Sequence, residues 1–90
     1  MYRISFVERA KEDLAKLKAS EPNSFKKATK LLAELAEHPT TGTGKPEQLK
    51  GDRVGQWSRR ISQKHRLIYT IHDDEVMVLV LAAYGHYDDK

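Results

Sequence analysis

The chain has 90 residues, with 16 lysines and arginines against 13 aspartates and glutamates, and it contains no cysteine. This length predicts one domain, residues 1–90, and the lack of cysteine excludes a disulfide framework and a thiolate metal site. No segment reaches the roughly 20 apolar residues of a membrane span, and residues 1–9 lack the apolar run of a signal peptide. We therefore expect a cytoplasmic protein without a membrane partner.

The first forty residues predict one strand followed by two helices. Tyr2–Val7 alternates apolar and polar side chains, which is typical of a half-buried strand. Residues 8–20 then repeat apolar side chains at helical spacing. A second amphipathic helix follows, which Asn23 or Ser24 can cap and which ends before Pro39. Two such helices need a sheet to cover.

The second half predicts strands. A loop rich in Gly, Thr and Pro leads to short strands over residues 47–50, 56–62, 65–73 and 75–84. The run Val76–Leu81 is apolar at every position, so this strand is expected inside the sheet with both faces covered. The order β-α-α-β-β-β-β predicts an α+β fold in which a helical layer packs on a sheet.

The segment of residues 45–66 carries seven basic residues against two acids, a local charge of about +5 that exceeds the +3 of the whole chain. Its basic residues are Lys45, Lys50, Arg53, Arg59, Arg60, Lys64 and Arg66. A local cationic patch with aromatic residues such as Trp57 is how a small protein binds an RNA or DNA backbone. The acids are too few to pair these cations, which favours an anionic ligand.

Side-chain parity decides which of these residues share a face of the sheet. Arg60 and Arg66 lie together only if the hairpin pairs them, which needs an odd-numbered loop such as residues 62–64, or a bulge. Arg59 then lies on the helix side, and we interpret it as structural. The apolar residues expected to face the helices in this register are Trp57, Ile61, Leu67, Tyr69 and Ile71.

Cleavage of RNA by internal transesterification needs a base for the 2′-OH, an acid for the departing 5′-oxygen and cations for the phosphate. Glu47 is the candidate base, although the nearby lysines could share the proton transfer. His86 is the candidate acid, because the unperturbed pKa of histidine lies near neutrality. His65 competes for this role because it adjoins Arg66, but its parity places it on the opposite face.

The remaining candidates would bind RNA. The planar guanidinium groups of Arg60 and Arg66 would hold the phosphate, and Lys45 belongs to the same cationic patch. Tyr87, or alternatively Tyr84, could stack on a base.

Four motifs closely resemble the YoeB/Txe family of bacterial toxins in the RelE/ParE superfamily. They are GKPEQLK at residues 44–50, GQWSRRI at 55–61, HRLIY at 65–69 and the late pair His86-Tyr87. The resemblance implies a microbial-RNase-like RelE fold with two helices on a twisted, mostly antiparallel sheet. It also implies a ribosome-dependent endoribonuclease that cuts mRNA in the A site, uses no metal or cofactor and leaves a 2′,3′-cyclic phosphate.

The resemblance also implies residue roles and partners. The family's base corresponds to Glu47, its phosphate-binding arginine to Arg66 and its acid to His86. The positions that support RNA binding or the transition state correspond to Lys50, Arg60 and Tyr87. Partners implied are the ribosome with its mRNA and a cognate antitoxin whose flexible segment wraps the toxin, with operator DNA bound only through that complex and a homodimer possible. The chain departs from the family in the Asp88-Asp89-Lys90 tail that follows the His-Tyr pair.

Two alternatives use the same scaffold. One is a non-catalytic inhibitor of gyrase like the ParE toxins, which does not need the Glu, Lys, Arg and His set. The other is an RNA-binding module, which predicts salt-dependent binding without turnover.

Overall fold

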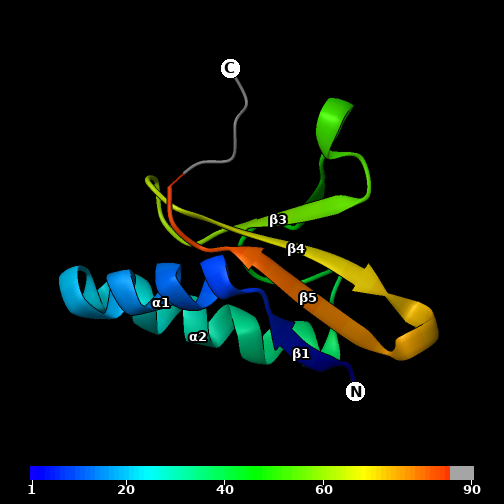
Figure 1. The fold of residues 1–90 in the computed structure, drawn as a ribbon, viewed down its shortest axis with the longest axis horizontal. Helices are drawn as coiled ribbons and strands as arrows, with labels where there is room; N and C mark the ends of the chain where they lie inside the picture. The colour runs from blue at the N-terminus through cyan, green and yellow to red at the C-terminus, as the bar shows by residue number, and fades with distance from the viewer. Residues whose placement is uncertain (86–90) are drawn as a thin grey trace.

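The computed structural model describes residues 1–85, which form two helices packed against one face of a five-stranded sheet (Figure 1). The elements are β1 (Arg3–Phe6), α1 (Glu8–Ser20), α2 (Pro22–Glu37), β2 (Glu47–Gln48), β3 (Gln56–Arg60), β4 (Arg66–His72) and β5 (Met77–Ala82). Two single-turn 3₁₀ helices, η1 (Gly51–Arg53) and η2 (Asp73–Glu75), lie between strands. The predicted α+β fold and element order are confirmed.

The strands lie in the order β1-β5-β4-β3-β2. Of these strands, β1 and β5 pair in parallel, while the other three pairs are antiparallel, as expected for a mostly antiparallel sheet. The strand β5 is interior, between β1 and β4, which confirms the inference from its apolar sequence. Its expected burial on both faces is only partly correct: Val78 and Val80 are buried, whereas Met77 and Leu79 are half-buried.

The helices cover one face of the sheet because each presents an apolar stripe at helical spacing. The buried core consists chiefly of Ala10, Leu17, Ala28, Leu31, Leu35, Leu67, Tyr69, Val78 and Val80. Trp57 and Ile71 pack against this cluster, and Ile61 belongs to it. The residues predicted to face the helices therefore do so.

The start of α2 differs from the expectation. The helix begins at Pro22, and its N-cap is Glu21 rather than Asn23 or Ser24. Proline suits the first helical position because its φ is already helical and its missing N–H would have no partner there. Asn23 and Ser24 therefore lie within the first turn instead of before it.

The β3–β4 hairpin has the predicted register. Arg60 pairs with Arg66 and Trp57 with Tyr69, and the N–H of Ile61 donates to the carbonyl of His65 at 3.0 Å to close the three-residue loop. Because alternate residues share a face, Arg60 and Arg66 lie on the side of the sheet away from the helices.

Candidate functional site

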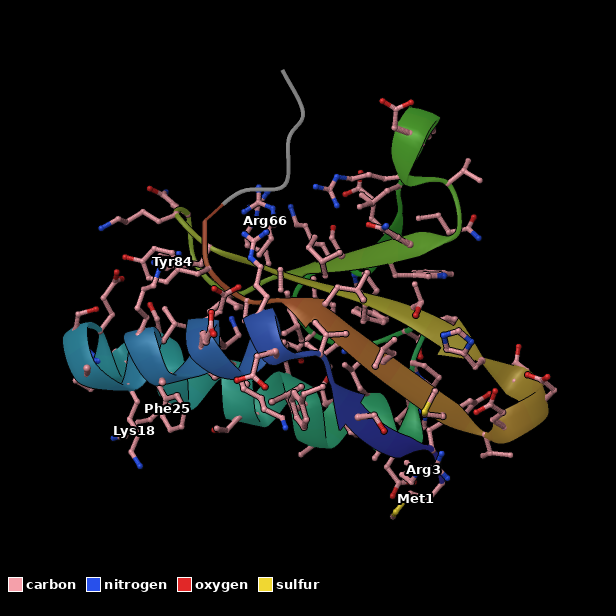
Figure 2. All side chains as sticks on the ribbon, viewed as in Figure 1. Met1, Arg3, Lys18, Phe25, Arg66 and Tyr84 are labelled. Carbon is pink, nitrogen blue, oxygen red and sulfur yellow. The ribbon has the colours of Figure 1, made fainter. Side chains whose placement is uncertain are left out.

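The face of the sheet opposite the helices, here called the open face, carries three of the predicted site residues. Glu47 pairs with Ser58 across β2 and β3, and Ser58 and Arg60 are two residues apart on one strand. Glu47, Arg60 and Arg66 therefore share this face. Figure 2 shows Arg66 on the side of the sheet away from α1 and α2. Glu47 lies two strands across and two residues along from Arg66, so their Cα atoms are roughly 12 Å apart, which leaves room for a phosphodiester between the two side chains.

Glu47 and Arg60 are exposed, and Arg66 is half-buried. The side-chain Nη1 of Arg66 donates to the carbonyl of Ser62 at 3.3 Å, so the guanidinium is anchored at one corner. A carboxylate on the same face as two guanidinium groups can take a proton from a ligand whose anionic group the guanidinium groups bind through planar forks.

Lys45 and Lys50 flank Glu47 in the chain, and both are exposed. The loop before Glu47 is tightly bent: Gly44 has φ 86° and Lys45 has φ 52°, in the left-handed region that non-glycine residues rarely adopt. The N–H of Arg60 donates to the carbonyl of Gly44 at 2.7 Å and ties this loop to β3. The backbone of Arg60 therefore fixes the loop that leads to Glu47, while the side chain of Arg60 lies on the open face.

Gly85 is the last residue that the structure describes, and it lies beside Arg66. The N–H of Arg66 donates to the carbonyl of Gly85 at 2.9 Å, and both residues line a small pocket of about 90 Å³ with Arg53. His86 and Tyr87 lie outside the described residues, so the roles assigned to them stay predictions.

His65 is buried on the helix side of the sheet, where it holds two distant segments together. Its Nδ1 accepts from the N–H of Gly85 at 2.8 Å, which places the ring proton on Nε2 toward the Glu21 carboxylate at 2.9 Å. This hydrogen bond holds the pKa of Glu21 below its ordinary value. The ring of Tyr84 lies against His65 at 4.4 Å. These contacts argue for a structural role and against the alternative that His65 is the acid.

Arg59 is fully buried, as its parity predicted. Its guanidinium lies 2.9 Å from the Glu34 carboxylate and also donates to backbone carbonyls of the loop after α2. The interpretation of Arg59 as structural is confirmed.

Asp13 supports the end of β5 and was not singled out from the sequence. It is buried and accepts the backbone N–H of Ala83 at 2.9 Å, with Arg9 at 3.5 Å. A signal was present, because Asp13 falls three residues after Ala10 and four before Leu17, on the apolar stripe of α1. An acid at such a position needs a buried partner.

Within residues 1–85, no cluster of three or more His, Cys, Asp or Glu side chains is arranged to hold a metal ion. In the same part of the chain, no helix has the length and apolar character needed to cross a membrane.

Solved structures with a similar fold include small bacterial toxins. The chain aligns with a YoeB/ParE toxin from Agrobacterium tumefaciens at a TM-score of 0.88 and 29% identity, over 94% of this chain and 99% of that one. A YoeB–YefM toxin–antitoxin heterotetramer from Staphylococcus aureus aligns at 0.82 and 33%, over 97% and 99%, and a YoeB dimer from that organism at 0.83 and 33%, over 96% and 98%. The two-helix layer on a mixed sheet thus defines the RelE/YoeB class of toxins.

The sequence comparison is more specific. Residues 6–87 match the family described as "YoeB-like toxin of bacterial type II toxin-antitoxin system". The chain is 45% identical over 85 residues to the toxin YoeB of Streptomyces coelicolor, covering 94% of this chain and 99% of that protein. The chain belongs to the YoeB-like toxin family.

Proposed function

We propose that this toxin is a ribosome-dependent endoribonuclease that cuts mRNA in the A site and so arrests translation in the cytoplasm. The observation that carries the proposal is the strand register, with Glu47 opposite Ser58 and Arg60 opposite Arg66. This register brings a carboxylate and two guanidinium groups from three strands to one open face. Metal-free cleavage of RNA needs a base and phosphate-binding cations in such proximity.

The proposed chemistry is an internal transesterification. The Glu47 carboxylate takes the proton of a ribose 2′-OH, and the 2′-oxygen attacks the adjacent phosphorus. The bond from phosphorus to the 5′-oxygen of the next nucleotide breaks, and His86 gives its proton to that oxygen. Arg60 and Arg66 neutralise charge on the phosphate, and the products are a 2′,3′-cyclic phosphate and a free 5′-OH. The fixed position of Gly85 beside Arg66 supports the assignment of His86, which follows it in the chain.

Lys45, Lys50 and Tyr87 complete the proposed site. The two exposed lysines would bind RNA backbone on either side of the scissile phosphate, and Tyr87 would stack on a base.

The test is primer extension on mRNA from cells that express the toxin, beside Glu47→Gln, with Glu12→Gln on the exposed face of α1 as the matched control. We expect discrete cuts with the wild type and the control, and a loss of roughly 10²–10⁴-fold with Glu47→Gln, the usual contribution of a general base. Growth arrest with a DNA-damage response and without cuts would instead indicate a gyrase inhibitor like the ParE toxins. Salt-dependent RNA binding without turnover would indicate an RNA-binding module.

We further propose a cognate antitoxin whose flexible segment wraps the toxin. The YoeB toxin of Staphylococcus aureus forms a heterotetrameric complex with YefM, and this supports the existence of such a partner. Operator DNA would be bound only through the toxin–antitoxin complex, and the free toxin would form a homodimer. Co-expression of the neighbouring reading frame should abolish the cuts and yield a co-purifying complex. A neighbouring product that neither binds nor relieves arrest would refute this partnership.

A further inference from the structure

The most heavily hydrogen-bonded side chain among the described residues lies outside the proposed site, behind the sheet. Arg59 is 0% exposed, yet its guanidinium carries a full charge. It donates through Nη1 to Glu34 at 2.9 Å and to the Thr43 carbonyl at 3.3 Å, and through Nη2 to the carbonyls of His38 and Thr41. A buried charge with this many partners constrains whatever it contacts.

These contacts converge on one segment, residues 38–46, here called the approach loop because it leads directly to Glu47. Nε of Arg59 donates to the Tyr69 hydroxyl at 3.3 Å, and that hydroxyl donates to the Pro39 carbonyl at 2.9 Å. Carbonyls of residues 38, 39, 41 and 43 are thus all bound from one side. The loop has no helix or strand of its own, so these bonds replace the missing backbone pairing.

Glu34 binds the same loop from α2. Its carboxylate accepts the N–H of Thr43 at 2.9 Å and the Thr43 hydroxyl at 2.6 Å. The backbone rests directly on this ion pair, because a Cβ at Gly42 would lie 2.6 Å from the Glu34 oxygen and 3.2 Å from Nη1 of Arg59. The approach loop cannot move without breaking contacts to both charges.

The backbone of the same strand also holds the loop, because the N–H of Arg60 donates to the Gly44 carbonyl at 2.7 Å. The side chains of the two adjacent arginines therefore lie on opposite faces. The Arg59 side chain holds the approach loop behind the sheet, while the Arg60 side chain lies on the open face. The loop is fixed immediately before Lys45 and Glu47.

We infer that Arg59 and Glu34 are positioning residues that hold the approach loop and thereby place Glu47 for proton transfer. The inference rests on the proposed nuclease function. Arg59 and Glu34 contact no substrate in this arrangement; they act through the loop. Misplacing a reacting group by about 1 Å can lower the rate by 10²-fold, so a looser loop should slow the chemical step more than it weakens binding.

The test avoids Arg59→Ala, which would leave a cavity behind the sheet, remove the donor to the carbonyls of His38, Thr41 and Thr43, and endanger the fold. Thr43→Val removes only the hydroxyl that joins the loop to Glu34, and Thr43→Ser keeps it. Arg59→Lys keeps the charge but cannot reach all the carbonyls. Matched controls are Thr29→Val, on the exposed face of α2, and Arg3→Lys, on β1. The melting temperature of each variant is measured first, and cleavage rates are then measured at a temperature far below all of the melting temperatures.

We expect amide exchange of residues 41–45 to accelerate about 10-fold or more in Thr43→Val and Arg59→Lys, with exchange of β4 and β5 unchanged. We expect kcat for mRNA cleavage on ribosomes to fall about 10-fold with KM unchanged. Thr43→Ser and both controls should match the wild type. Unchanged loop exchange, or a loosened loop with unchanged kcat, would overturn the inference.

The amide-exchange and cleavage measurements together separate this inference from the proposed function. A wild-type protein that cuts no RNA would overturn the nuclease proposal and the catalytic part of the inference together. Loop exchange does not depend on catalysis, so it would still decide whether Arg59 and Glu34 hold the approach loop.

Discussion

Arg60 and Arg66 face each other across β3 and β4, and like charges in such cross-strand pairs repel. A phosphate between the two guanidinium groups would turn this repulsion into attraction. The pair is therefore unfavourable for the stability of the free protein and favourable for the binding of an anion. Stability and function make opposite demands on the same position.

Replacing Arg60 with threonine should therefore raise the stability of the protein and lower its cleavage rate. Arg60→Thr removes one of two like charges from an exposed strand position, so the free energy of unfolding should rise by about 0.2–1 kcal/mol. The cleavage rate should fall roughly 10²–10³-fold, as when one transition-state donor is removed. Urea unfolding and primer extension measure the two effects, with Arg3→Thr as the control. If Arg60→Thr lost as much stability as the control Arg3→Thr, the argument that Arg60 and Arg66 repel each other would be contradicted.

Glu34 should make stability depend on acidity. The hydrogen bonds from the hydroxyl and N–H of Thr43, and then Arg59, hold the pKa of Glu34 below its ordinary 4.5. A lowered folded-state pKa stabilises the protein above pH 4.5, and the contribution disappears as pH falls through the folded value.

At pH 7, Glu34→Gln should therefore lower the free energy of unfolding by about 1.5–3 kcal/mol, the range for hydrogen bonds to charged groups. The difference from wild type should shrink on acidification toward pH 3. Urea titrations at several pH values measure it, and Glu37→Gln on the same helix is the control. A difference that stays constant from pH 7 to pH 3 would show that the charge of Glu34 has no part in it.

At the scale of elements, the local patterns were sufficient for most of the fold. Helical spacing located α1, and alternation located β1. Parity placed Arg59 and Arg60 on opposite faces, because a strand has a fixed period of two. The start of α2 at Pro22 was not predicted, since the asparagine and serine that follow are equally good caps and the choice depends on how the α1–α2 turn packs.

The non-local contacts could not be read from the sequence. Nothing in residues 3–6 specifies a parallel pairing with β5, more than seventy residues away, because such register depends on the closure of the whole sheet. The contacts of Arg59 are also non-local. Strand parity placed Arg59 on the helix side, but only the folded chain brings Glu34 and the loop carbonyls to it. Arg60 and Arg66 could be placed on one face from sequence because the register of a single hairpin decides it, whereas Glu47 was chosen from its motif and its face became known only from the pairing of β2 with β3.

The approach loop contains Gly44, and a comparison with Gly55 can test how far the loop depends on it. Gly44 has φ 86°, and a Cβ there would lie 3.0 Å from the Arg60 carbonyl. Gly55 has a similar φ of 92° but no heavy atom within 4 Å of such a Cβ. The two positions share the backbone strain of an L-residue and differ only in the contact with β3.

Gly55→Ala should therefore lower the free energy of unfolding by about 1–2 kcal/mol from strain alone. Gly44→Ala should lower it further and should reduce cleavage, because the loop must shift away from Arg60 and take Glu47 with it. Thermal unfolding and primer extension on both variants measure this. Equal losses at the two glycines would mean that the contact with Arg60 does not constrain the loop.

At the scale of the whole molecule, the lysines of the helices and the cations near Glu47 in the chain lie in different parts of the fold. The helices cover one face of the sheet, and most of their lysines are exposed. Lys45, Lys50, Arg60 and Arg66 belong to the strands and loops, and Arg9 of α1 also lines the pocket beside Arg66. Lys45 and Lys50 flank Glu47 in the chain. A net charge of +3 for the chain hides this separation.

Binding of a single-stranded RNA should reveal the separation through its dependence on salt. Each phosphate neutralised contributes about −0.7 to the slope of log K against log salt concentration. Lys45→Ala and Lys50→Ala should each make the slope less steep by about 0.7, because each lysine would lose one phosphate contact. Lys26→Ala and Lys30→Ala on the exposed surface of α2 are matched controls and should leave it unchanged. Fluorescence anisotropy with a non-cleavable 2′-deoxy oligonucleotide between about 50 and 200 mM salt measures these slopes. Equal changes for the helix and strand-side lysines would mean that RNA is attracted by overall charge rather than by the open face.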